Sequence, residues 1–190
     1  MAPPCAPEGV KVGCNRLQVR GGPVKSSKVV SAQDMDEPIV RKKSVSARND
    51  GTMKTHIDAG EYGGFVTDEP RAHGGSDGGP SPLQAVLGAL CGCEGVTFNR
   101  TATEFDFSYE GINFDGSYTI DIRGRMGDRR VRPHFQTVRV EARVRTEESE
   151  DRLREVVEET EARCPVYNLI SDAGVRMEIV WIREPPTEHA

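Results

Sequence analysis

Residues 79–93, GPSPLQAVLGALCGC, carry the strongest structural signals in the chain. Ser81 followed by Pro82 predicts the start of a helix, because a serine side chain can cap free backbone N–H groups and proline suits the first helical position. We expect a buried helix from Leu83 to about Phe98, since apolar side chains recur at helical spacing with small residues between them. The apolar positions are Leu83, Val86, Leu87 and Leu90.

This helix carries Cys91 and Cys93. Two positions along a helix turn a side chain by about 200°, so the two thiols face different sides. We interpret Cys91 as a small buried side chain. Cys93 has the same plain interpretation in a helix rich in glycine and alanine, and a reactive thiol is its alternative.

Upstream of the helix, the chain predicts short strands joined by tight turns. The apolar residues of 38–66 are interrupted by Asn49-Asp50-Gly51, which favours a hairpin turn. Arg48 lies at this turn, and Arg71 lies in the loop before the helix. The glycine-rich loop 74–82 matches neither of the common phosphate-binding patterns.

Downstream of the helix, alternating apolar and polar residues predict strands at 118–123 and 138–145. A charged amphipathic helix follows from Glu147 to Arg163, and a last strand covers 175–181. The order of strands, helix, strands, helices and strand indicates an α+β fold.

Cys164 lies directly before Pro165, which can open a short helix through Asp172. A cysteine in that place lies at the positive end of the helix dipole, which favours the thiolate form. This argument for a reactive Cys164 does not depend on Cys93.

The 190 residues suffice for one domain. Residues 1–37 are rich in proline and glycine and are expected to form an extended or disordered arm, with one domain over 38–190. The net charge of −5 argues against nucleic acid as a partner. No apolar run is long enough for a membrane span and no secretory signal is evident. Five cysteines, an odd number, predict reduced thiols in a cytoplasmic protein.

Two passages are similar to motifs of the OsmC/Ohr family. The first runs from Asp68-Glu69-Pro70 to Cys93 and resembles the family's loop and its Pro-initiated helix, which carries a cysteine about three turns in. The second is Cys164-Pro165-Val166, which is similar to the family's second cysteine motif. The chain is therefore identified as a member of this family over residues 38 to 183, whereas 1–37 have no counterpart.

The resemblance implies two central helices packed against curved antiparallel sheets in an intertwined homodimer, with active sites at the subunit interface. The apolar content of 36% is low and agrees with a core completed by a partner subunit. Glu94 falls on the mostly apolar face of the first helix and is then interpreted as a polar group satisfied at the dimer seam.

The resemblance also implies an enzyme, a hydroperoxide reductase that needs no metal, flavin or haem cofactor. Cys93 would attack an organic or hydrogen peroxide, Cys164 would close a disulfide on the resulting sulfenic acid, and a cellular dithiol would reduce that disulfide. In the family an arginine held by a glutamate activates the first cysteine. Arg71 and Arg48 are the candidates, Arg71 has the better matching neighbours, and a solvated surface arginine is the plain alternative for each.

The sequence departs from the family pattern at Leu83, where peroxidase members carry glutamate. Asp68, Glu69 and Glu94 are the candidates to replace that carboxylate. The departure favours an alternative class, a non-catalytic protein that binds a small apolar ligand in the pocket at the subunit interface and has inert cysteines. A redox-sensing protein that forms the disulfide without turnover is a third interpretation.

Overall fold

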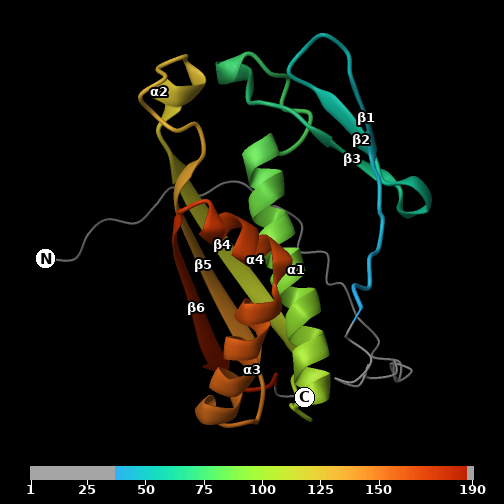
Figure 1. Cartoon of the computed structure of the whole chain (residues 1–190), viewed down its shortest axis with the longest axis vertical. Helices are drawn as coiled ribbons and strands as arrows, with labels where there is room; N and C mark the ends of the chain where they lie inside the picture. Colours follow the sequence, from blue (N-terminus) through green and yellow to red (C-terminus); the bar gives the residue numbers. More distant parts are fainter. Residues whose placement is uncertain (1–36, 188–190) are drawn as a thin grey trace, which may run out of the picture. The chain divides into compact units, whose positions relative to one another are not determined.

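The computed structural model describes residues 37–187. The expected N-terminal arm, 1–37, therefore lies outside the described residues except for its last one. From Val40 to the end of the described range the chain forms one compact unit, and Figure 1 shows its helices and strands. The predicted α+β class is confirmed, because helices and two separate sheets follow one another along this unit.

The first sheet is a three-stranded antiparallel meander of β1 (Ser46–Asn49), β2 (Thr55–Asp58) and β3 (Gly64–Thr67). The predicted turn at Gly51 joins β1 to β2, with φ of 83° at this glycine. Asn49 stabilises the turn, since its side-chain oxygen accepts a hydrogen bond from the Gly51 N–H at 2.9 Å. The predicted hairpin is therefore confirmed.

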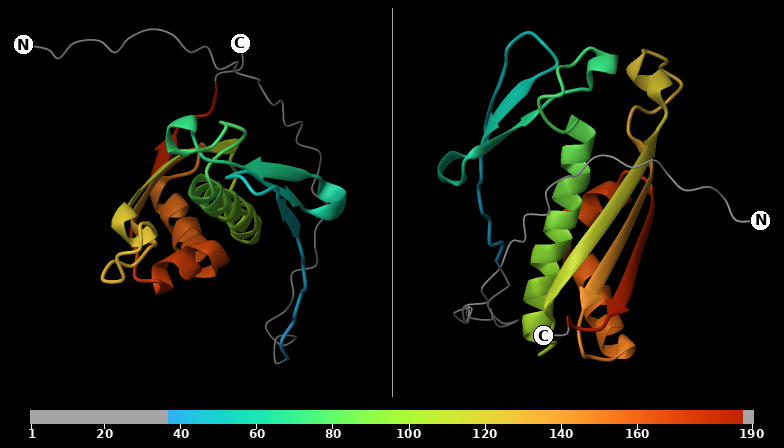
Figure 2. Two further views of the ribbon diagram at one scale, coloured as in Figure 1. Left: turned by 90° about the horizontal axis from the view of Figure 1, so that it is seen from above. Right: turned by 180° about the vertical axis from the view of Figure 1, so that it is seen from behind.

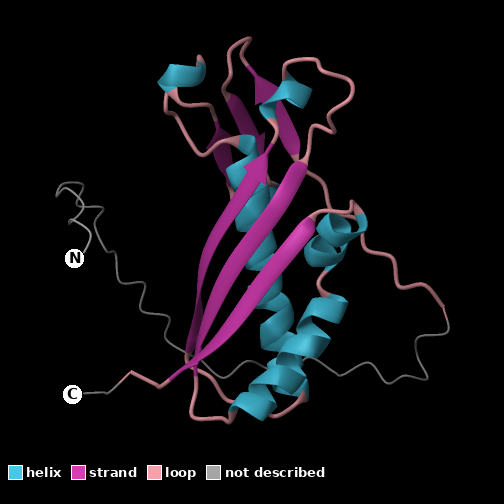
Figure 3. Cartoon of the chain, turned by 90° about the vertical axis from the view of Figure 1, so that its left-hand side faces the viewer, coloured by secondary structure: helices cyan, strands magenta, loops and turns pink. Residues whose placement is uncertain are grey.

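The second sheet contains β4 (Gly111–Ile120), β5 (Phe135–Arg145) and β6 (Arg176–Glu184), in that order. Strand β4 is antiparallel to β5, but β6 is parallel to β5. The expectation of purely antiparallel sheets is therefore wrong for the last strand. The reason is that two helices lie between β5 and β6 and return the chain to the end of the sheet where β5 began, as Figure 3 shows.

The strand predicted at 118–123 ends earlier than its alternating pattern indicated. Strand β4 stops at Ile120, and Asp121 caps a short helix α2 (Ile122–Arg125) by accepting a hydrogen bond from the Arg123 N–H. A side chain that caps a helix competes with strand pairing for the same backbone groups.

The long helix α1 spans Pro82–Glu104 and begins as the sequence predicted. The Ser81 side chain accepts from the Gln84 N–H, and the Gln84 side chain accepts from the Ser81 N–H. This reciprocal pair is a capping box. The helix runs past the predicted end at Phe98, because its last turns still bury Thr101 and Ala102.

Two further helices follow β5. Helix α3 (Glu150–Arg163) has Ser149 as its N-cap, and α4 (Pro165–Asp172) has Cys164 as its N-cap. Helices α1, α3 and α4 lie on one face of the β4–β6 sheet, which Figure 2 shows from two further directions. No helix within the described range combines the length and the apolar content that a membrane crossing requires.

The core between these helices and the sheet has two clusters of buried side chains. The first packs α1 and α4 against the sheet, and the second packs α1 and α3 against it. The first contains Leu87, Leu90, Phe135, Val138, Val140, Ile170 and Val175. The second contains Phe98, Ala102, Phe107, Val144, Leu153 and Val156.

Asp68 organises the loop that precedes α1. Its buried carboxylate accepts hydrogen bonds from the backbone N–H groups of Glu69, Ser76 and Gly78 and from the Ser76 hydroxyl. These donors lower the pKa of Asp68, the Ser76 hydroxyl most strongly. The loop also needs glycine at Gly75, where a Cβ would lie 1.6 Å from the Glu69 carbonyl oxygen. The start of α1 is thereby fixed.

Candidate active site

The fold brings Cys93 and Cys164 together from distant parts of the sequence. Cys93 is half-buried on α1, and Cys164 is fully buried between α3 and α4. Their thiols are close enough for the Cys93 side chain to affect the pKa of Cys164, and both cysteines are free. The packing of α1 against α3 and α4 is therefore what creates the pair.

Cys164 is held as a thiol. Burial is the main effect that raises its pKa, and the neighbouring Cys93 and Glu94 side chains raise it further. The Tyr167 N–H at the start of α4 donates to the Cys164 sulfur at 3.5 Å and acts in the opposite direction. The prediction that the helix dipole would favour the thiolate is therefore wrong for this state, because desolvation outweighs one backbone donor.

Glu94 is the unexpected member of the site. It is completely buried in a single protomer, and neither carboxylate oxygen has a hydrogen-bond partner of ordinary geometry in residues 37–187. Burial raises its pKa to about 7, repulsion from Glu161 adds to this, and the nearby Cys164 thiol partly offsets it. The interpretation of Glu94 as a satisfied group at a dimer seam is wrong, because its side chain leaves no surface for a partner to contact.

A second acidic side chain, that of Glu161, lies close to the group formed by Cys93, Cys164 and Glu94. Trp181 of β6 donates from its indole N–H to the Glu161 carboxylate of α3 at 3.0 Å. Burial raises the pKa of Glu161, and burial likewise raises the pKa of Tyr167, whose side chain interacts with that carboxylate. The surroundings of the two cysteines therefore favour protonated, neutral side chains.

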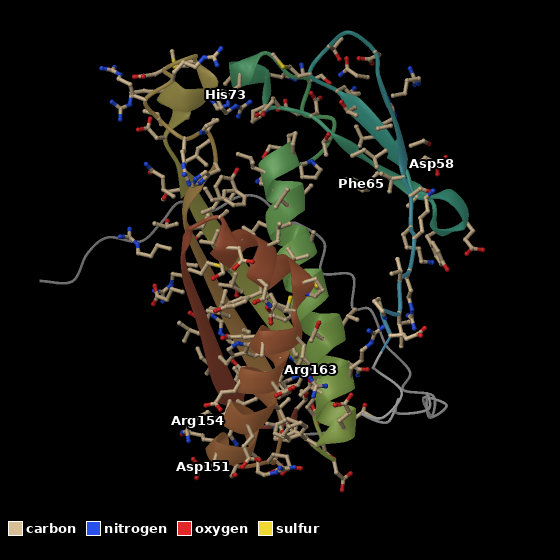
Figure 4. The ribbon with its side chains drawn as sticks, in the orientation of Figure 1. Asp58, Phe65, His73, Asp151, Arg154 and Arg163 are labelled. Carbon is tan, nitrogen blue, oxygen red and sulfur yellow. The ribbon has the colours of Figure 1, made fainter. Side chains whose placement is uncertain are left out.

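No arginine of the described chain supplies a positive charge to this cluster within one protomer. Arg71 lies exposed in a short 3-10 helix and pairs with Asp77 at 2.9 Å. Arg48 is exposed in β1. Arg163, labelled in Figure 4, precedes Cys164 in sequence, but its guanidinium pairs with Glu104 at the end of α1.

The three carboxylates that could replace the missing family glutamate lie in different surroundings. The Asp68 carboxylate accepts hydrogen bonds from backbone N–H groups of the loop, and Glu69 pairs with Arg125 at 3.2 Å. Glu94 is the one of the three that lies at the cysteines. Its signal in the sequence was an acidic residue at a mostly apolar helix position, whereas nothing in the sequence singled out Glu161.

Other features of the sequence lie away from the cysteine pair. Cys91 packs against the core cluster between α1 and the sheet, as predicted, but it is half-buried and not fully buried. A cavity of about 290 Å³ lies at the first turn of α1, is lined partly by Leu83, and contains neither cysteine of the pair. Among residues 37–187, no group of three or more His, Cys, Asp or Glu side chains is arranged to hold a metal ion.

The buried Glu94 gives a testable pH dependence of stability. With a folded-state pKa of about 7 and an ordinary unfolded value, the folded state binds more protons between about pH 4.5 and 7, so the free energy of unfolding falls as pH rises through this window. Glu94→Gln removes this effect, and its stability relative to wild type should rise by about 3 kcal/mol between about pH 5 and pH 8.

Urea unfolding under reducing conditions at the two pH values measures this difference. Glu158→Gln removes an exposed carboxylate of α3 and is the matched control, for which we expect no such change. Equal pH dependence of wild type and Glu94→Gln would show that Glu94 ionises normally in the folded protein.

Comparison with known proteins identifies the family. The model of the OsmC-like protein family matches residues 74–180, a range that begins in the loop before α1 and includes both cysteines of the pair. The chain belongs to this family. No curated protein sequence matched.

Solved structures agree on the fold. An OsmC-like protein from Mycoplasma pneumoniae is 16% identical, with 77% of this chain and 99% of that chain covered and a TM-score of 0.64. An organic hydroperoxide resistance protein from Legionella pneumophila is 17% identical, with 76% and 99% covered and a TM-score of 0.58. The organic hydroperoxide resistance protein OhrB of Bacillus subtilis is 19% identical, with 76% and 98% covered and a TM-score of 0.51.

Proposed function

We propose that this protein reduces organic or hydrogen peroxides through a redox pair of Cys93 and Cys164. The observation that carries the proposal is the contact between these two thiols, which come from separate helical segments. Membership of the OsmC-like family supports it, and similar folds include proteins named for organic hydroperoxide resistance.

The chemistry needs two thiols in different environments. The Cys93 thiolate attacks the peroxide, a sulfur–oxygen bond forms as the O–O bond breaks, and the departing oxygen leaves as an alcohol or water after taking a proton. Cys164 then displaces the hydroxyl of the sulfenic acid as water and closes the disulfide. A cellular dithiol reduces this disulfide to restore both thiols. The half-buried Cys93 suits the first role and the sheltered Cys164 suits the second.

We also propose that the enzyme is a cytoplasmic homodimer. Exposed apolar side chains on α1 and α4 support the dimer: Val86 is 41% exposed, Val96 56% and Leu169 70%. In one protomer Arg71 pairs with Asp77 and Arg48 faces solvent. An arginine that activates Cys93 would then reach it across the subunit interface.

A ligand-binding role with inert cysteines is the second candidate. The cavity of about 290 Å³ at the start of α1 favours it, because Leu83, Pro82 and Ile120 give the cavity apolar walls beside the Glu69–Arg125 ion pair. Such a protein would keep both thiols reduced in the presence of peroxide.

Mass spectrometry with alkylation of free thiols separates these functions. One equivalent of cumene hydroperoxide, added to reduced protein, should produce an intramolecular Cys93–Cys164 disulfide within seconds and leave Cys91 alkylated. If Cys93 and Cys164 both remain open to alkylation, the peroxidase proposal fails and the ligand-binding role gains support.

A further inference from the structure

The buried carboxyl group of Glu94 suggests a role within the proposed reaction. Neither of its oxygens has a hydrogen bond of ordinary geometry within residues 37–187, although the Cys164 thiol is near enough to affect its pKa, and the side chain has no exposed surface. Burying an acidic group without a partner costs folding free energy. Such costs occur most often at functional sites, where a perturbed group performs chemistry.

Glu94 contacts one of the two reacting sulfurs. It follows Cys93 directly on α1, and its side chain interacts with the Cys164 thiol, which in turn interacts with Cys93. The three side chains therefore form one cluster in which the carboxyl group lies beside the sulfur that must close the disulfide.

The other titratable groups that face Glu94 carry no positive charge. Glu161 faces it from α3 and Tyr167 from α4, and Cys91 interacts with it from α1. Cations stabilise a thiolate at reactive cysteines, and in the described protomer none is near enough to affect the pKa of Glu94 or of Cys164. Cys164 therefore has no cation to help it lose its proton.

This arrangement creates a chemical need at the second step of the reaction. A thiol attacks a sulfenic acid as the thiolate, and Cys164 is buried and holds its proton. A general base in contact with the thiol would remove the proton during the attack. Within the described chain, Glu94 is the carboxyl group placed to do so.

We propose that Glu94 is the general base, and then the general acid, of the step in which Cys164 closes the disulfide on Cys93; this role rests on the proposed peroxidase function. The carboxylate takes the S–H proton of Cys164 as its sulfur attacks the Cys93 sulfenic acid. The S–S bond forms, the S–O bond breaks, and Glu94 returns the proton to the departing hydroxyl. The products are the disulfide and one water, and Glu94 is again a carboxylate.

The proposal fixes the pH dependence of disulfide closure. Only the carboxylate form of Glu94 accepts a proton, and its pKa of about 7 means that this form increases from about pH 6 to pH 8. The closure rate should therefore rise across this interval and level off above it. Burial also raises the pKa of Glu161 and of Tyr167, but neither side chain affects the pKa of the reacting Cys164 thiol, so neither supplies the same profile.

The experiment measures closure separately from peroxide attack. Reduced full-length protein is mixed with one equivalent of cumene hydroperoxide, quenched at intervals with dimedone and an alkylating agent, and analysed by mass spectrometry. In Glu94→Gln, Cys93 should still form the sulfenic acid, which accumulates as its dimedone adduct. Closure should slow at least about a hundredfold and lose its rise between about pH 6 and pH 8. Glu158→Gln is the matched control and should close like wild type.

The outcomes distinguish this proposal from the proposed function. If Glu94→Gln closes the disulfide at the wild-type rate with the wild-type pH profile, Glu94 is not the base, although the peroxidase function stands. If wild-type Cys93 is not oxidised, the proposed function fails and the role of Glu94 fails with it. If Glu94→Gln does not fold, Glu94→Asp replaces it in the test, with slower closure that still rises with pH. An unchanged rate in that variant would overturn the proposal.

Discussion

Replacing Cys93, the proposed nucleophile, with serine is expected to lower kcat/KM for cumene hydroperoxide at least about a thousandfold, because a hydroxyl cannot replace a thiolate in that role. Peroxide consumption with dithiothreitol as the reductant measures this effect. Cys91→Ser is the matched control, since Cys91 lies on the same helix and is half-buried against the core. Its variant should retain the wild-type rate.

Cys164→Ser is expected to behave differently from Cys93→Ser. The first thiol remains, so the variant should consume about one equivalent of peroxide and stop at a Cys93 sulfenic acid that dimedone captures. Full turnover by Cys93→Ser would contradict the assigned nucleophile. A wild-type rate of disulfide formation in Cys164→Ser, through Cys91, would contradict the assigned resolving residue.

Phe98→Ala should destabilise the protein by about 3–5 kcal/mol, because it opens a large cavity in the core. Phe98 is fully buried. Its ring packs edge-on to Phe107 and Tyr109 at centroid distances of 5.9 and 5.0 Å and stacks on Trp181 at 5.2 Å. The expected fall in Tm is about 6–20 °C for a chain of this size.

Thermal unfolding followed by circular dichroism tests this prediction. Arg100→Ala changes an exposed position on the same helix and should alter stability by no more than about 0.5 kcal/mol. A loss below about 1 kcal/mol in Phe98→Ala would mean that the aromatic cluster is looser than its stacked and edge-on geometry implies. Because Phe98 stacks on Trp181, whose indole N–H also donates to Glu161, Phe98→Ala should in addition change the indole fluorescence of the folded protein.

The sequence correctly predicted those helix starts and turns that depend only on residues adjacent along the chain. Ser81, Pro82 and Gln84 are adjacent along the chain, and their capping geometry follows from backbone hydrogen bonding alone. The same holds for the start of α4 at Pro165 and for the turn at Gly51. The apolar period of α1 correctly identified Leu87 and Leu90 as buried, but it was wrong for Val86, which is 41% exposed.

The sequence did not predict features that depend on distant partners. The direction of β6 depends on where α3 and α4 return the chain, and a strand has the same alternating pattern in either direction. Strand β4 ended earlier than predicted because the Asp121 side chain caps helix α2, and this cap competed with the alternating apolar pattern of the strand. The state of Cys164 was misjudged because helix-dipole reasoning omits the desolvation that burial imposes.

The family motifs, the α+β class and the choice of Cys93 and Cys164 as candidate site residues could be read from the sequence, since each depends on neighbours along the chain or on a recognisable spacing. Three features depend on the tertiary structure instead. They are the position of Glu94 beside Cys164, the raised pKa values around them, and the pairing of Arg71 with Asp77. The physical reason is that the pKa of a side chain depends on the solvent and charges around it, and helix packing supplies both from residues far apart in sequence.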